Sequence, residues 1–370
     1  MTKLDELFAQ YGQSPWIDNI RRDWLNDGTL AEMVVKGVRG VTSNPSIFAK
    51  TLATSTAYDE MLEGKDDVDV EVLFEELAVR DVRDACDVLA SVHDASCGAF
   101  AAKDRRYCDG YVSLEVSPRL ARDTVATVTA AKRLAAEVGR ANVMIKIPGT
   151  KEGLPAVTEV LGAGINVNVT LIFSLDRYNE VITAWMDGLE LALTRRSDVS
   201  TIGSVASFFV SRVDVAVDAL LPEDDPRRGT TANAQVAGAY QLFRRRMASD
   251  RALALFGAGA QVQRPLWAST STKNPRYADL VYVENLIGPD TVDTMPDATI
   301  TAFQDHGHIA RTIDKGLDEA RATLDNLSRA GVDLAVLSST LEREGVEAFA
   351  KSFQDALSAI EMKLAEVSRR

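Results

Sequence analysis

The alternation of short apolar segments with long amphipathic helical patterns most narrows the folds open to this chain. Helical periodicity is clear at 72–92 and 174–193, and both patterns stand between short runs rich in β-branched and aromatic residues. Eight such runs are expected to be strands: 14–20, 37–45, 110–118, 143–149, 165–174, 203–212, 264–271 and 280–288. Strands that alternate with helices form a parallel sheet, and eight of them close a barrel. The sequence therefore predicts an α/β fold, a (β/α)8 barrel of the TIM type.

Helical segments outside this repeat complete the expected architecture. Two helix-rich insertions fall near 50–108 and 221–260, and the chain from His308 onward is expected to be helical. The apolar residues of the last helix share one stripe, which predicts a C-terminal helix docked on the barrel: Val346, Phe349, Phe353, Leu357, Ile360 and Leu364. With no low-complexity linker and no internal repeat, we expect a single domain over residues 1–370.

The composition restricts the partners of the protein. The formal net charge of −13 disfavours nucleic acid and anionic membranes, so an anionic substrate needs a local cluster of Arg or Lys. The N-terminal segment has no apolar core of a signal peptide, and no apolar run is long enough to cross a bilayer. We expect a cytoplasmic protein that acts on small molecules, and the sequence gives no oligomeric state.

The positions of cysteine and histidine in the sequence give little support for metal binding or redox chemistry. Cys86, Cys97 and Cys108 lack the spacing of a metal site, and we expect reduced, buried thiols. Of three histidines, His93 stands alone and the other two fall in the segment DHGH (305–308), which is expected to be a loop. No metal and no cofactor are predicted.

A lysine interrupts one apolar strand, VMIKIPG, at Lys146. Burying an ammonium without a partner is costly, so a lysine in this position needs a reason. Side chains alternate between the two faces of a strand, and in the following strand Asn166, Asn168 and Thr170 share one face. Because the outer face of a barrel strand packs against helices, the polar set must face the interior.

Polar interior residues gather in several strands at once. Barrel enzymes keep their catalytic groups at the carboxyl ends of the strands, where such residues converge. The members of this set come from five different strands, and we expect them to form one active site: Asp18, Asn44, Glu115, Lys146, Asn168 and Thr170.

Lys146 has three possible roles in such a site. It can bind phosphate as a point charge, form a structural ion pair with Glu115, or attack a carbonyl as a neutral amine and form a Schiff base. Schiff-base chemistry needs nearby groups that move protons, and Glu115 and Thr170 are candidates. This third role is favoured, although periodicity alone does not name the reaction.

Three motifs resemble a known family. The segment GVRGVTSNPSIF (37–48) closely resembles the N-terminal signature of transaldolases, IKIPGT (145–150) their Schiff-base lysine motif, and GINVNVTLIFS (164–174) their fifth-strand motif. Their order and spacing agree, the resemblance runs over most of the chain, and the length is similar to that of the longer bacterial branch. It implies a cofactor-free barrel that transfers a dihydroxyacetone unit between sugar phosphates in the non-oxidative pentose phosphate pathway.

The resemblance also implies roles for individual residues. Lys146 resembles the Schiff-base lysine, and Asp18 the general acid/base that cleaves the carbon–carbon bond. Glu115 and Thr170 resemble the pair that holds the catalytic water. The remaining matches imply substrate-binding residues for donor hydroxyls, lysine orientation or phosphate: Asn44, Asn168, Ser207 and Arg212.

The chain departs from the family pattern at one place. Many members carry a phosphate-binding arginine two residues after a serine on the seventh strand, here Ser269. The matching position is Ser271, and Lys273 is the nearest cation. Ser269 and Lys273 are therefore expected to take part in substrate binding.

Three other functions stay open at this stage. An aldolase of the same superfamily would release free dihydroxyacetone, but fructose 6-phosphate aldolase relatives tend to carry glutamine at the water-binding position, so Glu115 favours transfer. A barrel isomerase would use the lysine only to bind phosphate. A non-catalytic binding protein of the same fold would have no need of the full catalytic set.

Overall fold

The sheet is a closed parallel barrel. In the computed structural model, which describes residues 1–369 and only the backbone of residues 50, 53 and 54, seven parallel strands follow the order β1-β7-β6-β5-β4-β3-β2. Val41 makes parallel bridges to Ile17 of β1 and to Val112 of β2, so it stands in the eighth position and closes the gap. The strands are β1 (Gln13–Ile17), β2 (Val112–Glu115), β3 (Val143–Pro148), β4 (Val167–Ile172), β5 (Ser204–Phe209), β6 (Arg264–Ala268) and β7 (Thr291–Met295). The expected TIM-type barrel is confirmed.

Two of the eight expected strands differ from the prediction. The run at 37–45 forms only the isolated bridge at Val41. The neighbouring residue, Gly40, packs closely against the Trp16 ring, and a Cβ at this position would lie 2.3 Å from that ring. The prediction of a strand at 280–288 is wrong, because this stretch holds the short helix α13 (Val281–Glu284). The last strand is β7, whose sequence TVDTM carries too few apolar residues to stand out as a strand.

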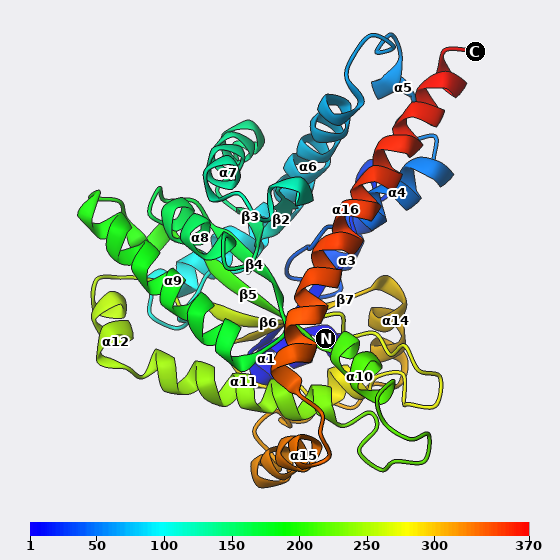
Figure 1. Ribbon diagram of the computed structural model, residues 1–370. Coiled ribbons are helices and arrows are strands. Elements are labelled where there is room, and N and C mark those ends of the chain that lie inside the picture. Colours follow the sequence, from blue (N-terminus) through cyan, green and yellow to red (C-terminus); the bar gives the residue numbers. More distant parts are fainter. Residues whose placement is uncertain (370) are drawn as a thin grey trace.

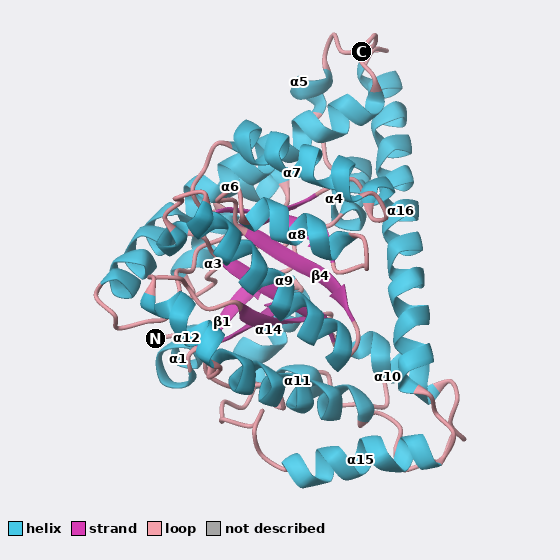
Figure 2. Ribbon diagram, turned by 60° about the vertical axis from the view of Figure 1, so that its left-hand side comes forward, coloured by secondary structure: helices cyan, strands magenta, loops and turns pink. Residues whose placement is uncertain are grey.

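Helices surround the barrel on all sides (Figures 1 and 2). The patterns at 72–92 and 174–193 are confirmed as the long helices α6 and α9. The longer helices are α1 (Lys3–Tyr11), α4 (Pro45–Thr54), α6 (Val70–Ala101), α7 (Thr124–Val138), α8 (Gly153–Leu161), α9 (Leu175–Thr194), α10 (Ser211–Asp218), α11 (Thr231–Met247), α12 (Asp250–Gly257), α14 (Asp297–His306), α15 (Leu317–Arg329) and α16 (Leu334–Val367). The shorter ones are α2 (Arg22–Asp27), α3 (Thr29–Val35), α5 (Asp59–Leu62) and the 3₁₀ helices η1 (Pro118–Leu120) and η2 (Val199–Thr201).

The C-terminal helix α16 docks on the barrel, as its apolar stripe predicts. It runs along one side of the molecule beside α4 and α10 (Figures 1 and 2). Phe349, Phe353 and Ile360 are buried, and the Ser338 hydroxyl donates to the carbonyl of Phe173 at 2.9 Å. Phe173 directly follows β4, so α16 reaches the end of the barrel where that strand ends.

A buried polar network fills the amino-terminal end of the barrel. Asp109 Oδ1 accepts hydrogen bonds from Trp16 Nε1 at 2.9 Å and from Arg264 at 3.2 Å, and Oδ2 accepts one from Arg39 at 3.1 Å. Burial acts to raise the pKa of Asp109, but Arg264 and Arg39 outweigh it and hold the pKa below its usual value. This end is a packed structural support, which leaves the opposite end for chemistry.

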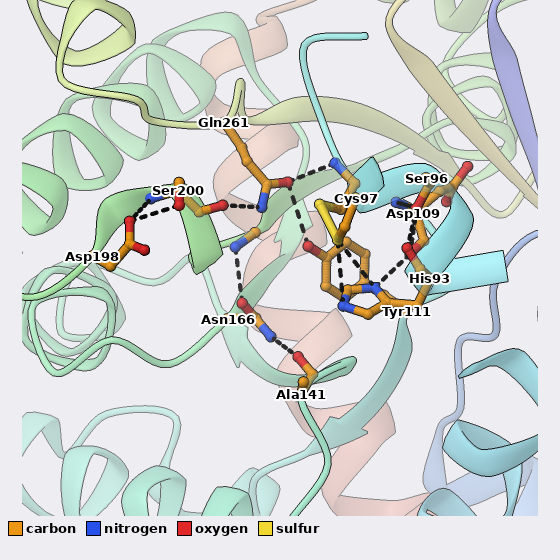
Figure 3. The surroundings of a disulfide bond; sticks show 12 residues. His93, Ser96, Cys97, Asp109, Tyr111, Ala141, Asn166, Asp198, Ser200 and Gln261 are labelled. Carbon is orange, nitrogen blue, oxygen red and sulfur yellow. Dashed lines mark hydrogen bonds between the residues drawn. A yellow bond between two sulfur atoms is a disulfide. The ribbon is translucent and has the colours of Figure 1, made fainter. Parts of the chain in front are cut away.

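Two cysteines are joined, which corrects the expectation of reduced thiols. Cys97, near the end of α6, forms a disulfide with Cys108, eleven positions later in sequence (Figure 3). The chain folds back after α6 and brings the two Cα atoms to 4.6 Å, a separation that disulfides require and sequence spacing does not reveal. Cys86 is a free, buried thiol, as expected.

The disulfide should contribute to stability. In the chain-entropy model, a cross-link over a sequence separation of 11 is worth about 2–3 kcal/mol. Cys97→Ser should therefore lower Tm by about 2–4 °C in a chain of this size, as measured by thermal unfolding. Reductant should lower Tm of the wild type by a similar amount and leave that of Cys97→Ser unchanged. A wild type indifferent to reductant would show that the bond does not stabilise the fold.

Two of the three histidines, His306 and His308, lie at and just after the end of α14. His306 is the last residue of α14, not part of a loop as expected, and its Nε2 contacts the Asp279 carboxylate at 3.1 Å; His308 does lie in the loop that follows. Within residues 1–369 no group of three or more His, Cys, Asp or Glu side chains is arranged to hold a metal ion. None of the described helices has the length and apolar character needed to cross a bilayer.

Candidate active site

A cavity of about 410 Å³ opens at the carboxyl ends of the strands. Residues that follow β1, β5 and β6 line it together with inward-facing residues of β3, β4 and β5. Of the ten residues expected from the sequence, eight lie on its wall: Asp18, Asn44, Lys146, Thr170, Ser207, Arg212, Ser269 and Lys273. Glu115 and Asn168 do not line this cavity but contact residues that do.

Lys146 is almost completely removed from solvent. Its side chain is 7% exposed, and Nζ donates a hydrogen bond to the carbonyl of Ser43 at 3.2 Å. Glu115 Oε2 lies 3.9 Å from Nζ, and the Phe349 ring of α16 lies 5.6 Å from it. The amine thus has one backbone acceptor, one acid within reach and an aromatic ring that helps to exclude water.

Glu115, at the end of β2, is a buried acid with unused hydrogen-bonding capacity. Its side chain is 6% exposed, and neither carboxyl oxygen has a hydrogen-bond partner among the described residues. Burial raises the pKa of Glu115 to about 7; Lys146 opposes the shift and Asp18 adds to it. A carboxyl whose pKa is raised toward neutrality is suited to accept or donate a proton at neutral pH.

Asp18 is held in place by Thr42 and by the backbone of β7. Thr42 Oγ1 lies 2.7 Å from Asp18 Oδ1, to which it donates, and 2.7 Å from the hydroxyl oxygen of Thr294 on β7. The Asp18 backbone N–H donates to Met295 O at 2.9 Å. A carboxylate fixed in this way at the cavity wall suits a general acid or base.

Asn168 supports the wall from behind. Its Nδ2 donates to Ser113 Oγ at 3.0 Å, and its Oδ1 accepts from Ser207 Oγ at 2.7 Å. In the sheet Asn168 pairs directly with Lys146. Because Asn168 does not line the cavity and its amide contacts Ser113 and Ser207, this geometry favours support of Ser207 over binding a donor hydroxyl.

Thr170 on β4 and Asn44 at the start of α4 both line the cavity. Thr170 is fully buried, and its hydroxyl has no partner among the described residues. Asn44 caps α4, its Oδ1 accepting from the N–H of Ile47 at 3.2 Å, which leaves its amide N–H groups available to the cavity.

Besides Lys146, three basic side chains line the cavity, and two of these three have no carboxylate partner within the described residues. Arg21 forms an ion pair with Asp23 at 2.5 Å. Arg212 packs over the Phe209 ring, and Lys273 donates to Ser271 Oγ at 2.5 Å. Burial lowers the pKa of Arg212, and partial desolvation and Arg212 lower that of Lys273, while Asp18 opposes both shifts. Uncompensated cations side by side suit a doubly charged anion.

Several residues of the wall escaped the sequence analysis. Arg21 stands only three positions after Asp18, so its place in the same loop was a usable signal. Phe349 and Ser352 come from α16, more than 200 positions from Lys146, and Ser352 Oγ accepts from the Ser46 hydroxyl at 2.6 Å. The apolar stripe of α16 predicts docking but not where the helix lands.

A buried amine beside an acid, a second fixed carboxylate and free cations in one barrel cavity define a class of enzyme. They are the groups needed for covalent chemistry on the carbonyl of a phosphorylated compound. The family model described as transaldolase/fructose-6-phosphate aldolase matches residues 15–360. The chain belongs to this family, as the three motifs suggested.

Curated relatives are similar over nearly their whole length. A transaldolase from Frankia alni is 48% identical over 98% of this chain and 97% of its own. Transaldolase 1 of Streptomyces coelicolor is 47% identical over 96% of this chain and 93% of its own. Transaldolase 2 of a Nostoc species is 42% identical over 96% of both chains. These similarities favour transaldolase over the aldolase alternative.

Proposed function

We propose that this protein is a transaldolase that transfers a dihydroxyacetone unit between sugar phosphates through a Schiff base on Lys146. The donor is sedoheptulose 7-phosphate and the acceptor glyceraldehyde 3-phosphate, which gives erythrose 4-phosphate and fructose 6-phosphate, and the reaction runs in both directions. The observation that carries the proposal is the Lys146 amine, 7% exposed and 3.9 Å from Glu115, in a cavity that also holds Arg212 and Lys273.

In the first half of the reaction the donor becomes bound to Lys146 as an imine, and its C3–C4 bond is then broken. The Lys146 amine adds to the C2 ketone of the donor and water leaves, which gives an imine that accepts electrons from the neighbouring C3–C4 bond. Asp18 takes the proton of the C4 hydroxyl as this bond breaks. The aldose phosphate leaves, and a three-carbon enamine stays on Lys146.

The second half reverses these steps on a new aldehyde. The enamine carbon attacks C1 of the acceptor, and Asp18 returns its proton to the new hydroxyl. Water then hydrolyses the imine and frees the product. Glu115, 3.9 Å from the Lys146 amine, and Thr170, on the cavity wall, both carry side-chain oxygens without a hydrogen-bond partner among the described residues. A water held between them would be oriented by Thr170 and deprotonated by Glu115, whose pKa burial raises to about 7.

Transfer and aldolase activity are separated by one measurement. With sedoheptulose 7-phosphate and glyceraldehyde 3-phosphate, the protein should produce fructose 6-phosphate without a burst of free dihydroxyacetone. Free dihydroxyacetone formed from fructose 6-phosphate alone, at the rate of transfer, would favour the aldolase instead.

Phosphate binding falls to Arg212 and Lys273. At a net charge of −13 the overall field repels a sugar phosphate, so the attraction must be local. Arg212 can hold two phosphate oxygens at once, and Lys273 adds a point charge at the rim. Both line the cavity together with Ser269 and Ser271.

Arg212→Ala and Lys273→Ala should each raise KM for fructose 6-phosphate by roughly 10- to 150-fold, because a hydrogen bond to a charged group is worth about 1.5–3 kcal/mol. Steady-state kinetics with erythrose 4-phosphate and with unphosphorylated glyceraldehyde as acceptors gives the measurement. At saturating fructose 6-phosphate, the KM for glyceraldehyde should change much less than the KM for erythrose 4-phosphate.

Arg276→Ala is the matched control, since Arg276 lies on the same loop as Lys273 but pairs with Glu223 outside the cavity. An unchanged KM in Lys273→Ala would leave Arg212 as the main phosphate ligand.

We also propose a cytoplasmic location. Sugar phosphates are charged and do not cross a bilayer unaided, so their enzymes work where they are made. Cell fractionation with an antibody against the protein tests this directly.

A further inference from the structure

The segment after β6 forms part of the cavity wall and needs support from outside it. Ser269, Ser271 and Lys273 line the cavity, and Ser269 has a φ of 60°, a conformation that costs energy for a residue other than glycine. Between them, Thr270 is fully buried and does not line the cavity; its Oγ1 lies 2.9 Å from Asp293 Oδ1 and 3.1 Å from Thr294 O. Thr270 therefore anchors this segment to β7.

Asp293 is a buried acid that the reaction does not use. It alternates along β7 with Thr294, which lines the cavity, so its side chain projects away from the cavity. The residue is 0% exposed, and Oδ2 has no hydrogen-bond partner within residues 1–369. Its neighbours on the adjacent strands are Pro15 and Trp267, neither of which titrates.

Ionised Asp293 would be an uncompensated charge in the protein interior. Burial raises its pKa to about 8, the hydrogen bond from Thr270 acts in the opposite direction, and no charged group of the described chain contributes. An unpaired buried carboxylate is costly, whereas a carboxylic acid leaves only a carbonyl oxygen without a partner.

The number of hydrogens at Thr270 favours the same protonation state. The Thr270 hydroxyl has one hydrogen and two oxygen neighbours, and the carbonyl of Thr294 only accepts. If Thr270 donates to Thr294 O, the contact to Asp293 becomes a hydrogen bond only when Asp293 supplies the hydrogen. Both contacts are then hydrogen bonds, whereas ionised Asp293 would compete with Thr294 for one hydrogen.

We propose that Asp293 is a positioning residue that, in its protonated form, donates to Thr270 and holds the 269–273 segment in the conformation that presents Ser269, Ser271 and Lys273 to the substrate phosphate. The proposal rests on the proposed function for the identity of the ligand. It assigns no contact between Asp293 and substrate.

The test is the pH dependence of phosphate binding in three proteins. Wild type, Asp293→Asn and Thr270→Val are compared between about pH 7 and 9, by KM for fructose 6-phosphate and by calorimetric affinity for inorganic phosphate.

In the wild type, KM should rise roughly 2- to 10-fold, the size of one lost hydrogen bond, as pH passes about 8. Asp293→Asn donates from its amide at every pH, so its KM should stay near the neutral wild-type value. Thr270→Val should show the raised KM already at pH 7, and at each pH kcat should be similar in the three proteins.

Two outcomes would overturn the proposal. An alkaline rise of equal size in Asp293→Asn would assign the titration to a group that faces the cavity, such as Lys273, whose pKa burial lowers. A wild-type KM at pH 7 in Thr270→Val would show that the anchor is not needed. Failure of the proposed function gives a different result, a wild type without transfer activity, and the affinity for inorganic phosphate still tests Asp293 in that case.

Discussion

Lys146→Arg should reduce transfer to background, a loss on the order of 10⁴-fold or more, while the protein stays folded. Arginine keeps the positive charge and can still donate to the carbonyl of Ser43, but a guanidinium does not lose its proton in a protein and cannot form an imine. Steady-state transfer rates, with circular dichroism and thermal unfolding as a check of the fold, give the measurement. A phosphate-binding or structural lysine would predict substantial remaining activity.

A borohydride trap separates these roles without relying on the rate. Fructose 6-phosphate and borohydride should convert wild-type Lys146 to a stable secondary amine, found by peptide mapping, and Lys146→Arg should give no adduct. Lys151→Arg is the matched control, since Lys151 is exposed five positions further on and should leave both trapping and transfer unchanged. An adduct on any lysine other than Lys146 would contradict the assignment.

The barrel follows from features that a single sequence shows directly. Apolar runs of strand length, separated by helices, leave few alternatives to a parallel sheet, and six of the eight expected runs contain a strand. Helix-covered strands must be apolar outside, so the position of Lys146 in VMIKIPG already placed its side chain toward the interior. The cavity wall confirms that direction.

The errors share a physical cause, which is that pairing partners lie far apart in the sequence. TVDTM becomes β7 because β1 and β6 lie on either side of it, and LVYVENLIG has enough apolar residues for a strand but buries them around α13. Cys97 and Cys108 meet because of a turn that their spacing does not encode. Long-range contacts of this kind are visible only in three dimensions.

The site residues also divide into those that the local sequence pattern places and those that long-range packing places. Residues on regular strands, such as Lys146 and Thr170, could be assigned to the interior by counting. Glu115 also faces inward, yet it stands next to the cavity wall and reaches the site through Lys146. The position of Phe349 near Lys146 depends on where α16 docks. The alternation of side chains within a strand gives no information about that docking.

Asp18→Asn should slow transfer by roughly 10²–10⁴-fold, the range of a general acid–base group, without preventing Schiff-base formation. Asparagine keeps an oxygen that accepts from Thr42 Oγ1, so the loop after β1 should keep its conformation, but the amide cannot take the proton of the C4 hydroxyl. The donor should therefore remain intact on Lys146.

The mass of the trapped adduct makes this expectation decisive. In the wild type, borohydride with fructose 6-phosphate should leave a mixture that includes the three-carbon unit on Lys146, whereas Asp18→Asn should leave the six-carbon sugar phosphate. Mass spectrometry of the Lys146 peptide distinguishes the two directly. Asp27→Asn serves as a control, because Asp27 is exposed, does not line the cavity and accepts a hydrogen bond from the N–H of Thr29. If Asp18→Asn yielded the three-carbon adduct as fast as the wild type, bond cleavage would use another base. Among the described acids near the amine, Glu115 would then be the candidate, since burial raises its pKa to about 7 and it lies 3.9 Å from the nitrogen of Lys146.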